Sequence, residues 1–403
     1  MKYVVILGDG MADFPNEKLN GKTPLELAKK PNIDSLCAFS QVGKCRTVPC
    51  GMKPGSDVAN LSVLGYDVKE CYTGRSPLEA ASIGIELKDT DVTARANLVT
   101  LTSEENFEDK TMVDYSAGEI STEEAKVLIE YLAEKLNCEE YKLFAGISYR
   151  HCLVIDGGKI AGDLTPPHDI TGKPIKEHLP KSKTGGFYLD LMKKSVELLK
   201  DHPVNLERIK AGKRPASSLW FWGEGTKPNL QNFEERTGKK GAMISAVDLL
   251  KGIGKLNGMR VIEVEGATGN YDTNFTGKKD ACLNALNSGC DFVYIHMEAP
   301  DECGHHGDAE KKIYSIEQID EKVVGPIFNA LTESGEDFAL LIAPDHPTPL
   351  STMTHCSDPV PFLIYKSNEN LYNGANAYTE DEAEKTGLKI NSGVELMKRF
   401  LNK

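Results

Sequence analysis

Carboxylate and imidazole side chains recur directly after short apolar segments of this 403-residue chain, near residues 3–7, 292–295 and 338–342. The set comprises Asp9, Asp301, His305, Asp345, His346 and His355. Carboxylate oxygens and imidazole nitrogens are typical ligands of Zn²⁺ or Mn²⁺, and their convergence from several strand ends is what a two-metal centre requires. Taken singly, each residue is better explained as the start of a turn or a helix cap. As a set at three strand ends, they predict a metal site.

A serine that could act as a nucleophile lies in a different segment. Ser56 follows Pro54-Gly55 and precedes an apolar stretch. The spacing alone favours a helix N-cap. A helix N-terminus would also stabilise a phosphorylated serine, however, and a metal could ionise its hydroxyl at neutral pH. Both roles of Ser56 therefore remain open on spacing alone.

The elements that must position these residues alternate along the chain. The three apolar segments are nearly continuous, which is typical of buried strands in a parallel sheet. An amphipathic helical pattern separates the second from the third, with apolar residues at Ile313, Ile316, Ile319, Val323, Ile327 and Leu331. This order predicts a doubly wound α/β fold, in which ligands bind beyond the carboxyl ends of the strands.

The middle of the chain has a different character. Its apolar runs are shorter and are interrupted by turn-rich patches such as 164–168 and 171–174. We therefore expect an α+β domain at 67–214, inserted into a first domain formed by 1–66 and 215–403. The α/β pattern is expected to resume at the apolar run 218–222.

Composition limits the classes of ligand. With 40% hydrophobic and 27% charged residues, the chain has the composition of a globular enzyme. Its net charge of -13 argues against nucleic acid and anionic lipid, so a bound phosphate must be held by a local device. No apolar run reaches membrane-spanning length. Ten dilute cysteines without a Cys-x-x-Cys pair predict a reduced, cytoplasmic protein. The oligomeric state is not predicted.

Several motifs together resemble a known family. They are Leu7-Gly8-Asp9-Gly10, Gly55-Ser56-Asp57-Val58-Ala59-Asn60, Asp301 to His305, Pro344-Asp345-His346 and His355 to Pro361, with further matches at Arg95-Ala96-Asn97, Gly266 to Gly269 and Asp272-Thr273. In this order they look like the cofactor-independent phosphoglycerate mutases of the alkaline phosphatase superfamily, in the archaeal-type branch. The resemblance covers nearly the whole chain.

The resemblance implies an isomerase of glycolysis that interconverts 3-phosphoglycerate and 2-phosphoglycerate through a phosphoserine. By this likeness Ser56 is the nucleophile, the inserted domain is a lid, and Lys278 assists phosphate binding. The implied cofactors are two divalent metal ions, with Mn²⁺ favoured and Zn²⁺, Co²⁺ or Mg²⁺ as alternatives. Neither 2,3-bisphosphoglycerate nor a nucleotide is implied. The implied ligands are Asp9, Ser56, Asp345 and His346 for one ion and Asp301, His305 and His355 for the other.

The substrate's carboxylate and phosphate should be bound by cations of the inserted domain, because arginine binds both groups in bidentate fashion. The candidates are Arg75, Arg95, Arg150 and Arg214, and the candidates for a general acid or base are Asp114, His151 and His168.

The chain departs from the family pattern where Tyr115, Ser116 and Trp222 stand in place of expected basic residues. This leaves three alternatives open. The chain could transfer phosphate to another small hydroxy compound such as homoserine, it could hydrolyse phosphomonoesters, or it could bind metal without catalysis.

Overall fold

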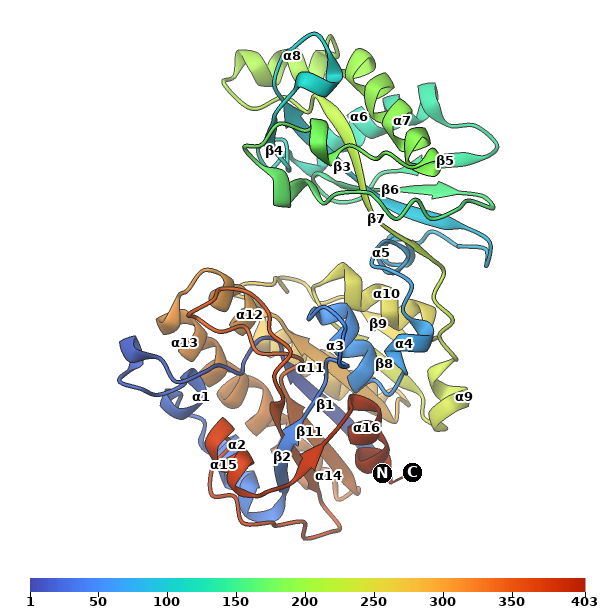
Figure 1. The fold of residues 1–403 in the computed structure, drawn as a ribbon. Helices are drawn as coiled ribbons and strands as arrows, with labels where there is room; N and C mark the ends of the chain where they lie inside the picture. Colours follow the sequence, from blue (N-terminus) through green and yellow to red (C-terminus); the bar gives the residue numbers. More distant parts are fainter. Residues whose placement is uncertain (403) are drawn as a thin grey trace. The chain divides into compact units, whose positions relative to one another are not determined.

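The protein, represented by a computed structural model that describes residues 1–402, consists of two compact units (Figure 1). The first unit contains Met1–Tyr72 and the chain from Asn229 onward, and the second unit is Thr73–Pro228. The second unit is therefore an insertion into the first. The junctions lie after Tyr72 and after Pro228, whereas the predicted junctions lie at 66/67 and 214/215.

An eight-stranded sheet forms the centre of the first unit, in the order β13-β2-β12-β11-β1-β10-β8-β9. The strands from β11 to β9 in this order run parallel, whereas β12 is antiparallel to both of its neighbours. The strand bounds are β1 (Lys2–Gly8), β2 (Gln41–Cys45), β8 (Gly241–Ile244), β9 (Arg260–Ile262), β10 (Phe292–Met297), β11 (Phe338–Ala343), β12 (Val360–Lys366) and β13 (Lys389–Ile390). The three predicted apolar segments are β1, β10 and β11, and they are direct neighbours.

Helices cover both faces of this sheet, which confirms the predicted doubly wound α/β class (Figure 1). Val4 and Ile6 of β1 point into one core, which they share with Ile319 and Ile327. On the other face, Tyr3 contacts the ring of Phe400 at a centroid distance of 5.4 Å. The helices of this unit are α1 (Pro24–Leu27), α2 (Pro31–Leu36), α3 (Ser56–Val63), α4 (Val68–Cys71), α9 (Phe233–Thr237), α10 (Asp248–Leu256), α11 (Phe275–Asn287), α12 (Ala299–His305), α13 (Ala309–Ile319), α14 (Gly325–Ser334), α15 (Glu380–Lys385) and α16 (Gly393–Leu401).

The amphipathic pattern between the second and third strands forms α13 and α14, joined by a π-helical turn at Asp320–Val324. Asp320 in this turn accepts hydrogen bonds from the backbone N–H groups of Asn32 and Ile33 at the start of α2. The carboxylate thus satisfies N–H groups that a helix start leaves without an intrahelical partner. The predicted helix is confirmed, with a π turn that the spacing alone does not show.

The second unit is an antiparallel α+β structure. Its sheet has the path β4-β3-β6-β5, and β7 pairs with β3. The bounds are β3 (Val92–Leu101), β4 (Met112–Asp114), β5 (Tyr141–Phe144), β6 (Arg150–Ile155) and β7 (Ser218–Thr226), with helices α5 (Ser76–Ser82), α6 (Thr122–Leu136), α7 (Lys183–Leu199) and α8 (Pro203–Lys210).

The position of β7 corrects one prediction. The apolar run 218–222 was expected to resume the sheet of the first unit, but it lies in β7, antiparallel to β3 of the second. The run is apolar because Leu219, Trp220 and Phe221 belong to the core of the second unit. Apolarity shows that a strand is buried, but not which sheet buries it.

Among residues 1–402, no helix combines the length and the apolar composition that crossing a membrane requires.

The central strand generates a stability prediction. Ile6 is fully buried in β1 between two parallel neighbours. We expect Ile6→Ala to lower the free energy of unfolding by about 2–5 kcal/mol, because it leaves a cavity in the core. The matched control, Phe39→Ala, removes a side chain that is 54% exposed and should cost about 1 kcal/mol or less. Urea denaturation followed by circular dichroism measures both, and equal losses would contradict this description of the core.

Candidate active site

The sheet register brings two of the predicted acidic residues together. Leu7 of β1 lies opposite Ala343 of β11, so Asp9 and Asp345, each two residues further on, leave the sheet side by side. Asp301 lies in α12, which begins directly after the neighbouring strand β10. All three carboxylates therefore follow the carboxyl ends of adjacent parallel strands, where such folds bind ligands.

Two groups of potential metal ligands lie at this edge. Ligand atoms of Asp9, Asp345 and His346 lie within 4.8 Å of one another, and so do those of Asp301, His346 and His355. His346 belongs to both groups, so the groups adjoin. The structure thus brings together five of the seven residues that the resemblance assigned to two ions.

The remaining predicted ligand, His305, lies beside the second group. Its Nε2 is 3.2 Å from Oδ2 of Asp301 and 2.9 Å from Nε2 of His355. Two imidazole nitrogens at this distance, both directed toward one carboxylate, match the donor set of a shared cation.

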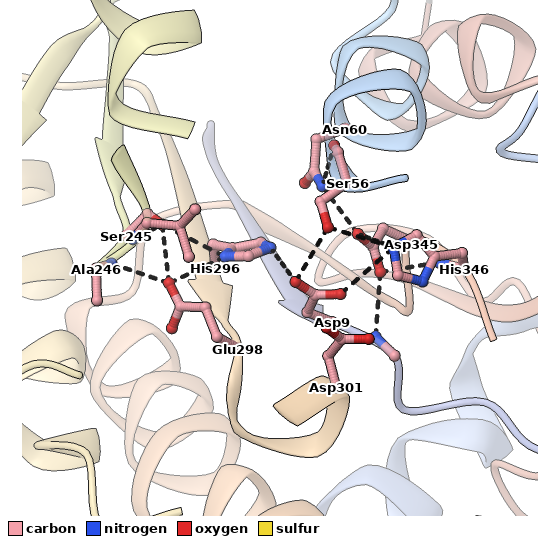
Figure 2. A network of polar contacts seen from close by, with 12 residues as sticks. Asp9, Ser56, Asn60, Ser245, Ala246, His296, Glu298, Asp301, Asp345 and His346 are labelled. Carbon is pink, nitrogen blue, oxygen red and sulfur yellow. Dashed lines mark hydrogen bonds and ion pairs between the residues drawn. The ribbon is translucent and has the colours of Figure 1, made fainter. Parts of the chain in front are cut away.

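Ser56 is the first residue of α3, and its Oγ lies 3.5 Å from Oδ2 of Asp9 and 3.3 Å from Nε2 of His346 (Figure 2). The helix N-cap is Gly55, and no side chain caps this end. The N-cap interpretation of Ser56 is therefore wrong. Its hydroxyl instead points to the first group of ligands.

One turn later in α3, Asn60 fixes the serine, and the sequence analysis missed this residue as a site residue. Its amide nitrogen donates to the backbone oxygen of Ser56 at 2.8 Å and to Oδ2 of Asp345 at 3.0 Å. Tyr294 of β10 donates its hydroxyl to the side-chain oxygen of Asn60 at 2.6 Å. The i,i+4 spacing of Ser56 and Asn60 on a helix was the available signal.

The electrostatics of the site suit a cation. Burial and the nearby Asp345 and Asp301 carboxylates raise the pKa of Asp9 well above its usual range. Its Oδ1 is buried and has no hydrogen-bond partner among the described residues. Burial also lowers the pKa of His346, which favours the neutral imidazole that ligates metals. A divalent cation would supply the missing partner and offset the repulsion between the carboxylates.

Gly10 is required for the close approach of two strand ends. Its φ is 61°, and a Cβ at this position would lie 2.6 Å from the Cα and from Oδ1 of Asp301. Glycine therefore allows Asp9 and Asp301 to approach each other here.

Lys278, predicted to assist phosphate binding, is fully buried in α11. Its Nζ lies 2.5 Å from Oε2 of Glu298 and donates to the backbone oxygen of His296 at 2.9 Å. These contacts direct its ammonium group toward His296 and Glu298. The sequence analysis missed His296 and Glu298, although both follow the predicted strand directly.

Three of the predicted substrate-binding arginines gather around one carboxylate in the second unit. Nε of Arg75 and Nε of Arg95 lie 2.9 Å and 2.8 Å from the two oxygens of Glu79. Although burial raises it, the charges of Arg95, Arg75 and Arg150 hold the pKa of Glu79 below its usual value. The group carries more positive than negative charge, so it can bind an anion.

The residues that replace expected cations lie near these arginines. The guanidinium of Arg95 lies 4.0 Å from the centroid of a Trp222 ring. His168 contacts both Trp222 and Tyr115 through their ring edges, at centroid distances of 5.0 Å and 6.2 Å. We call Tyr115, His168 and Trp222 the aromatic group. Tyr115 and Trp222 leave this part of the second unit with two fewer positive charges than the expected basic residues would give it.

The other predicted residues of the second unit have structural partners. Arg214 forms an ion pair with Asp114, which also accepts hydrogen bonds from the backbone N–H and the hydroxyl of Ser116. The structure does not place this pair with the arginines around Glu79. Burial lowers the pKa of His151 to about 3, so we do not propose it as the acid or base.

The fold and the site together define a doubly wound α/β protein with two groups of potential metal ligands beside a serine, and with an α+β unit inserted after α4. A family model described as 2,3-bisphosphoglycerate-independent phosphoglycerate mutase matches residues 38–205. The chain is 49% identical to the enzyme of that name from Methanosarcina barkeri, over 98% of both chains. It is 47% identical to a probable enzyme of that name from Geobacter sulfurreducens, over 100% of both chains.

Solved structures agree with these relatives. A protein from Pyrococcus horikoshii aligns with a TM-score of 0.82 at 32% identity, over 100% of this chain and 97% of that one. The cofactor-independent phosphoglycerate mutase from Thermoplasma acidophilum aligns with a TM-score of 0.67 at 26% identity, over 100% and 99%. The chain belongs to the family of 2,3-bisphosphoglycerate-independent phosphoglycerate mutases, which confirms the resemblance.

The raised pKa of Asp9 generates a prediction for the metal-free protein. A carboxyl group whose pKa is higher in the folded state than in the unfolded state destabilises the fold once the pH exceeds its unfolded value of about 4. We therefore expect Asp9→Asn to raise the melting temperature in EDTA at pH 8, and to raise it less at pH 5. A metal-free variant that melts below the wild type at pH 8 would contradict this description of the site.

Proposed function

We propose that this chain interconverts 3-phosphoglycerate and 2-phosphoglycerate through a phosphoserine at Ser56. The observation that carries the proposal is the position of the Ser56 hydroxyl at the start of α3, facing Asp9 and His346. A helix N-terminus stabilises the negative charge of a phosphoserine, and the family membership supplies the reaction class.

Two divalent cations would be held by the residues of the two ligand groups. Asp9, Ser56, Asp345 and His346 would hold one cation, and Asp301, His305 and His355 the other. Such cations lower the pKa of a bound hydroxyl and neutralise charge on a phosphoryl group in transfer. Mixed oxygen and nitrogen ligands suit Mn²⁺, Zn²⁺, Co²⁺ and Mg²⁺, and we propose Mn²⁺.

In the proposed reaction, the hydroxyl of Ser56 loses its proton as Oγ attacks the phosphorus of 3-phosphoglycerate, and the bond to the O3 oxygen breaks. The glycerate keeps that oxygen and takes up a proton on it, which makes it a hydroxyl. Its 2-hydroxyl then loses its proton and attacks phosphoserine 56, and the released Oγ of Ser56 takes up a proton again. Asn60 holds the backbone of Ser56 throughout, through its 2.8 Å hydrogen bond.

The inserted unit would act as the lid that retains glycerate and excludes water between the two transfers. Arg75, Arg95 and Arg150 would bind the substrate's anionic groups there. Water that reached phosphoserine 56 would turn the mutase into a phosphatase. We place this reaction in the cytoplasm and in glycolysis.

The aromatic group favours one second candidate. Tyr115 and Trp222 stand where the family pattern has cations, so a less anionic hydroxy compound such as homoserine would also suit this surface as the acceptor from phosphoserine 56.

A coupled assay tests the proposal. Purified protein with Mn²⁺ and 3-phosphoglycerate should form 2-phosphoglycerate, which added enolase converts to a product measured by its absorbance. We expect Ser56→Ala to lower kcat by at least about 1,000-fold, because the nucleophile is lost. The matched control is Ser62→Ala, in the same helix, which should change kcat/KM by about two-fold or less.

Four outcomes test the proposal and its alternatives. No turnover by the wild type would refute the mutase, and transfer from a phosphate donor to homoserine would then identify the second candidate. Release of inorganic phosphate without 2-phosphoglycerate would identify a hydrolase. Ser56→Ala activity near the wild-type rate would refute the role of Ser56.

A further inference from the structure

A chain of buried polar groups extends from Asp9 into the interior of the first unit (Figure 2). Nε2 of His296 lies 3.1 Å from Oδ2 of Asp9, and Nδ1 of the same ring lies 3.0 Å from Oε1 of Glu298. Oε2 of Glu298 lies 2.5 Å from Nζ of Lys278. His296 and Lys278 are fully buried, and Glu298 is 4% exposed.

Glu298 is held from three elements of the fold. The hydroxyl of Ser245 and the backbone N–H of Ala246, both directly after β8, donate to its Oε1 at 2.8 Å and 2.9 Å. Lys278 reaches it from α11, and Glu298 itself follows β10. A carboxylate with this many partners has a single orientation, so it can orient the ring that it contacts.

The ring of His296 lies between two carboxylates, with a hydrogen bond to Glu298 and a charge contact to Asp9. Its ring nitrogens face Asp9 on one side and Glu298 on the other. A neutral imidazole has one N–H, whereas an imidazolium has two, so the doubly protonated ring suits both neighbours. The charges then alternate along Lys278, Glu298 and His296, which lowers the cost of burying them, and the second ring N–H faces Asp9.

This arrangement directs the two oxygens of Asp9 differently. Oδ2 faces His296 and also lies 3.5 Å from Oγ of Ser56, while Oδ1 lies 3.7 Å from Nε2 of His346 and has no hydrogen-bond partner among residues 1–402. Oδ2 is therefore held by contacts within the protein, and Oδ1 is the oxygen left for a cation.

We propose that Lys278, Glu298 and His296 are positioning residues that hold Asp9 in the orientation needed to bind a divalent cation. Lys278 then acts through Glu298 and not by contact with phosphate. The inference rests on the proposed function of Asp9 as a cation ligand. Loss of a residue that orients a metal ligand typically lowers the metal affinity by about 10- to 100-fold.

Mn²⁺ titration of EDTA-stripped protein tests the inference without an activity measurement. Calorimetry is performed at a temperature at which circular dichroism shows each variant folded. We expect His296→Leu to weaken Mn²⁺ binding at one of two sites by about 10- to 100-fold. His296→Gln keeps an N–H donor and should recover part of this loss. The control His151→Leu removes another buried histidine, in the second unit, and should leave the affinity unchanged.

Lys278→Met distinguishes a positioning role of the lysine from direct contact with phosphate. A positioning role predicts weaker Mn²⁺ binding, as for Glu298→Gln. A phosphate-contact role predicts unchanged Mn²⁺ binding and a higher KM for 3-phosphoglycerate.

The contradicting results are distinct. Wild-type Mn²⁺ affinity in His296→Leu would overturn the inference, and so would equal losses in His296→Leu and His296→Gln. If His296→Leu does not fold, wild-type Mn²⁺ affinity in Glu298→Gln would overturn the inference instead. A wild-type protein that binds no Mn²⁺ would instead refute the proposed metal site, and this inference with it.

Discussion

Repulsion between Asp9, Asp345 and Asp301, of which the first two are buried and the third is partly buried, is the constraint on which this site depends. Asp9, Asp301 and Asp345 follow adjacent parallel strands, and the sheet leaves them no room to separate. Burial strengthens the repulsion, because the protein interior screens charge poorly. The fold can hold these groups together only if positive charge lies nearby. The His296 ring beside Asp9 can provide part of that charge. The oxygen of Asp9 that has no hydrogen-bond partner among the described residues indicates where a cation would provide the rest.

The net charge of -13 argues against some anionic ligands but not against all of them. It argues against a polyanionic ligand, because the field of the whole protein repels one. A single small phosphomonoester depends instead on local charge. Cations at the strand ends and the arginines around Glu79 would supply it, so an acidic protein can still act on an anionic substrate.

The sequence predicted the parts of the site that follow strands directly. Asp9, Asp301, Asp345 and His346 could be found because each stands next to an apolar run, and parallel neighbours place their ends together. His296 and Glu298 also follow the predicted strand and were open to the same argument. Asn60 and the contact between Lys278 and Glu298 could not be found in this way, since their partners come from distant segments.

The same limit explains the errors in the fold. The run 218–222 is a buried strand, as its apolar residues predict. Its partner β3, however, lies more than 100 positions earlier in the chain. The N-cap interpretation of Ser56 failed because Gly55 occupies that position, and a local pattern does not distinguish the two registers. Local sequence thus predicts elements and their ends, whereas pairing and register require the tertiary structure.

The account depends most on the claim that these carboxylates and imidazoles hold two divalent cations. Anomalous X-ray scattering from crystals grown with Mn²⁺ measures this directly. The account predicts two peaks about 3.5–4 Å apart, one among Asp9, Asp345 and His346 and the other among Asp301, His305 and His355. Crystals with bound Mn²⁺ elsewhere and no peak at either position would contradict it.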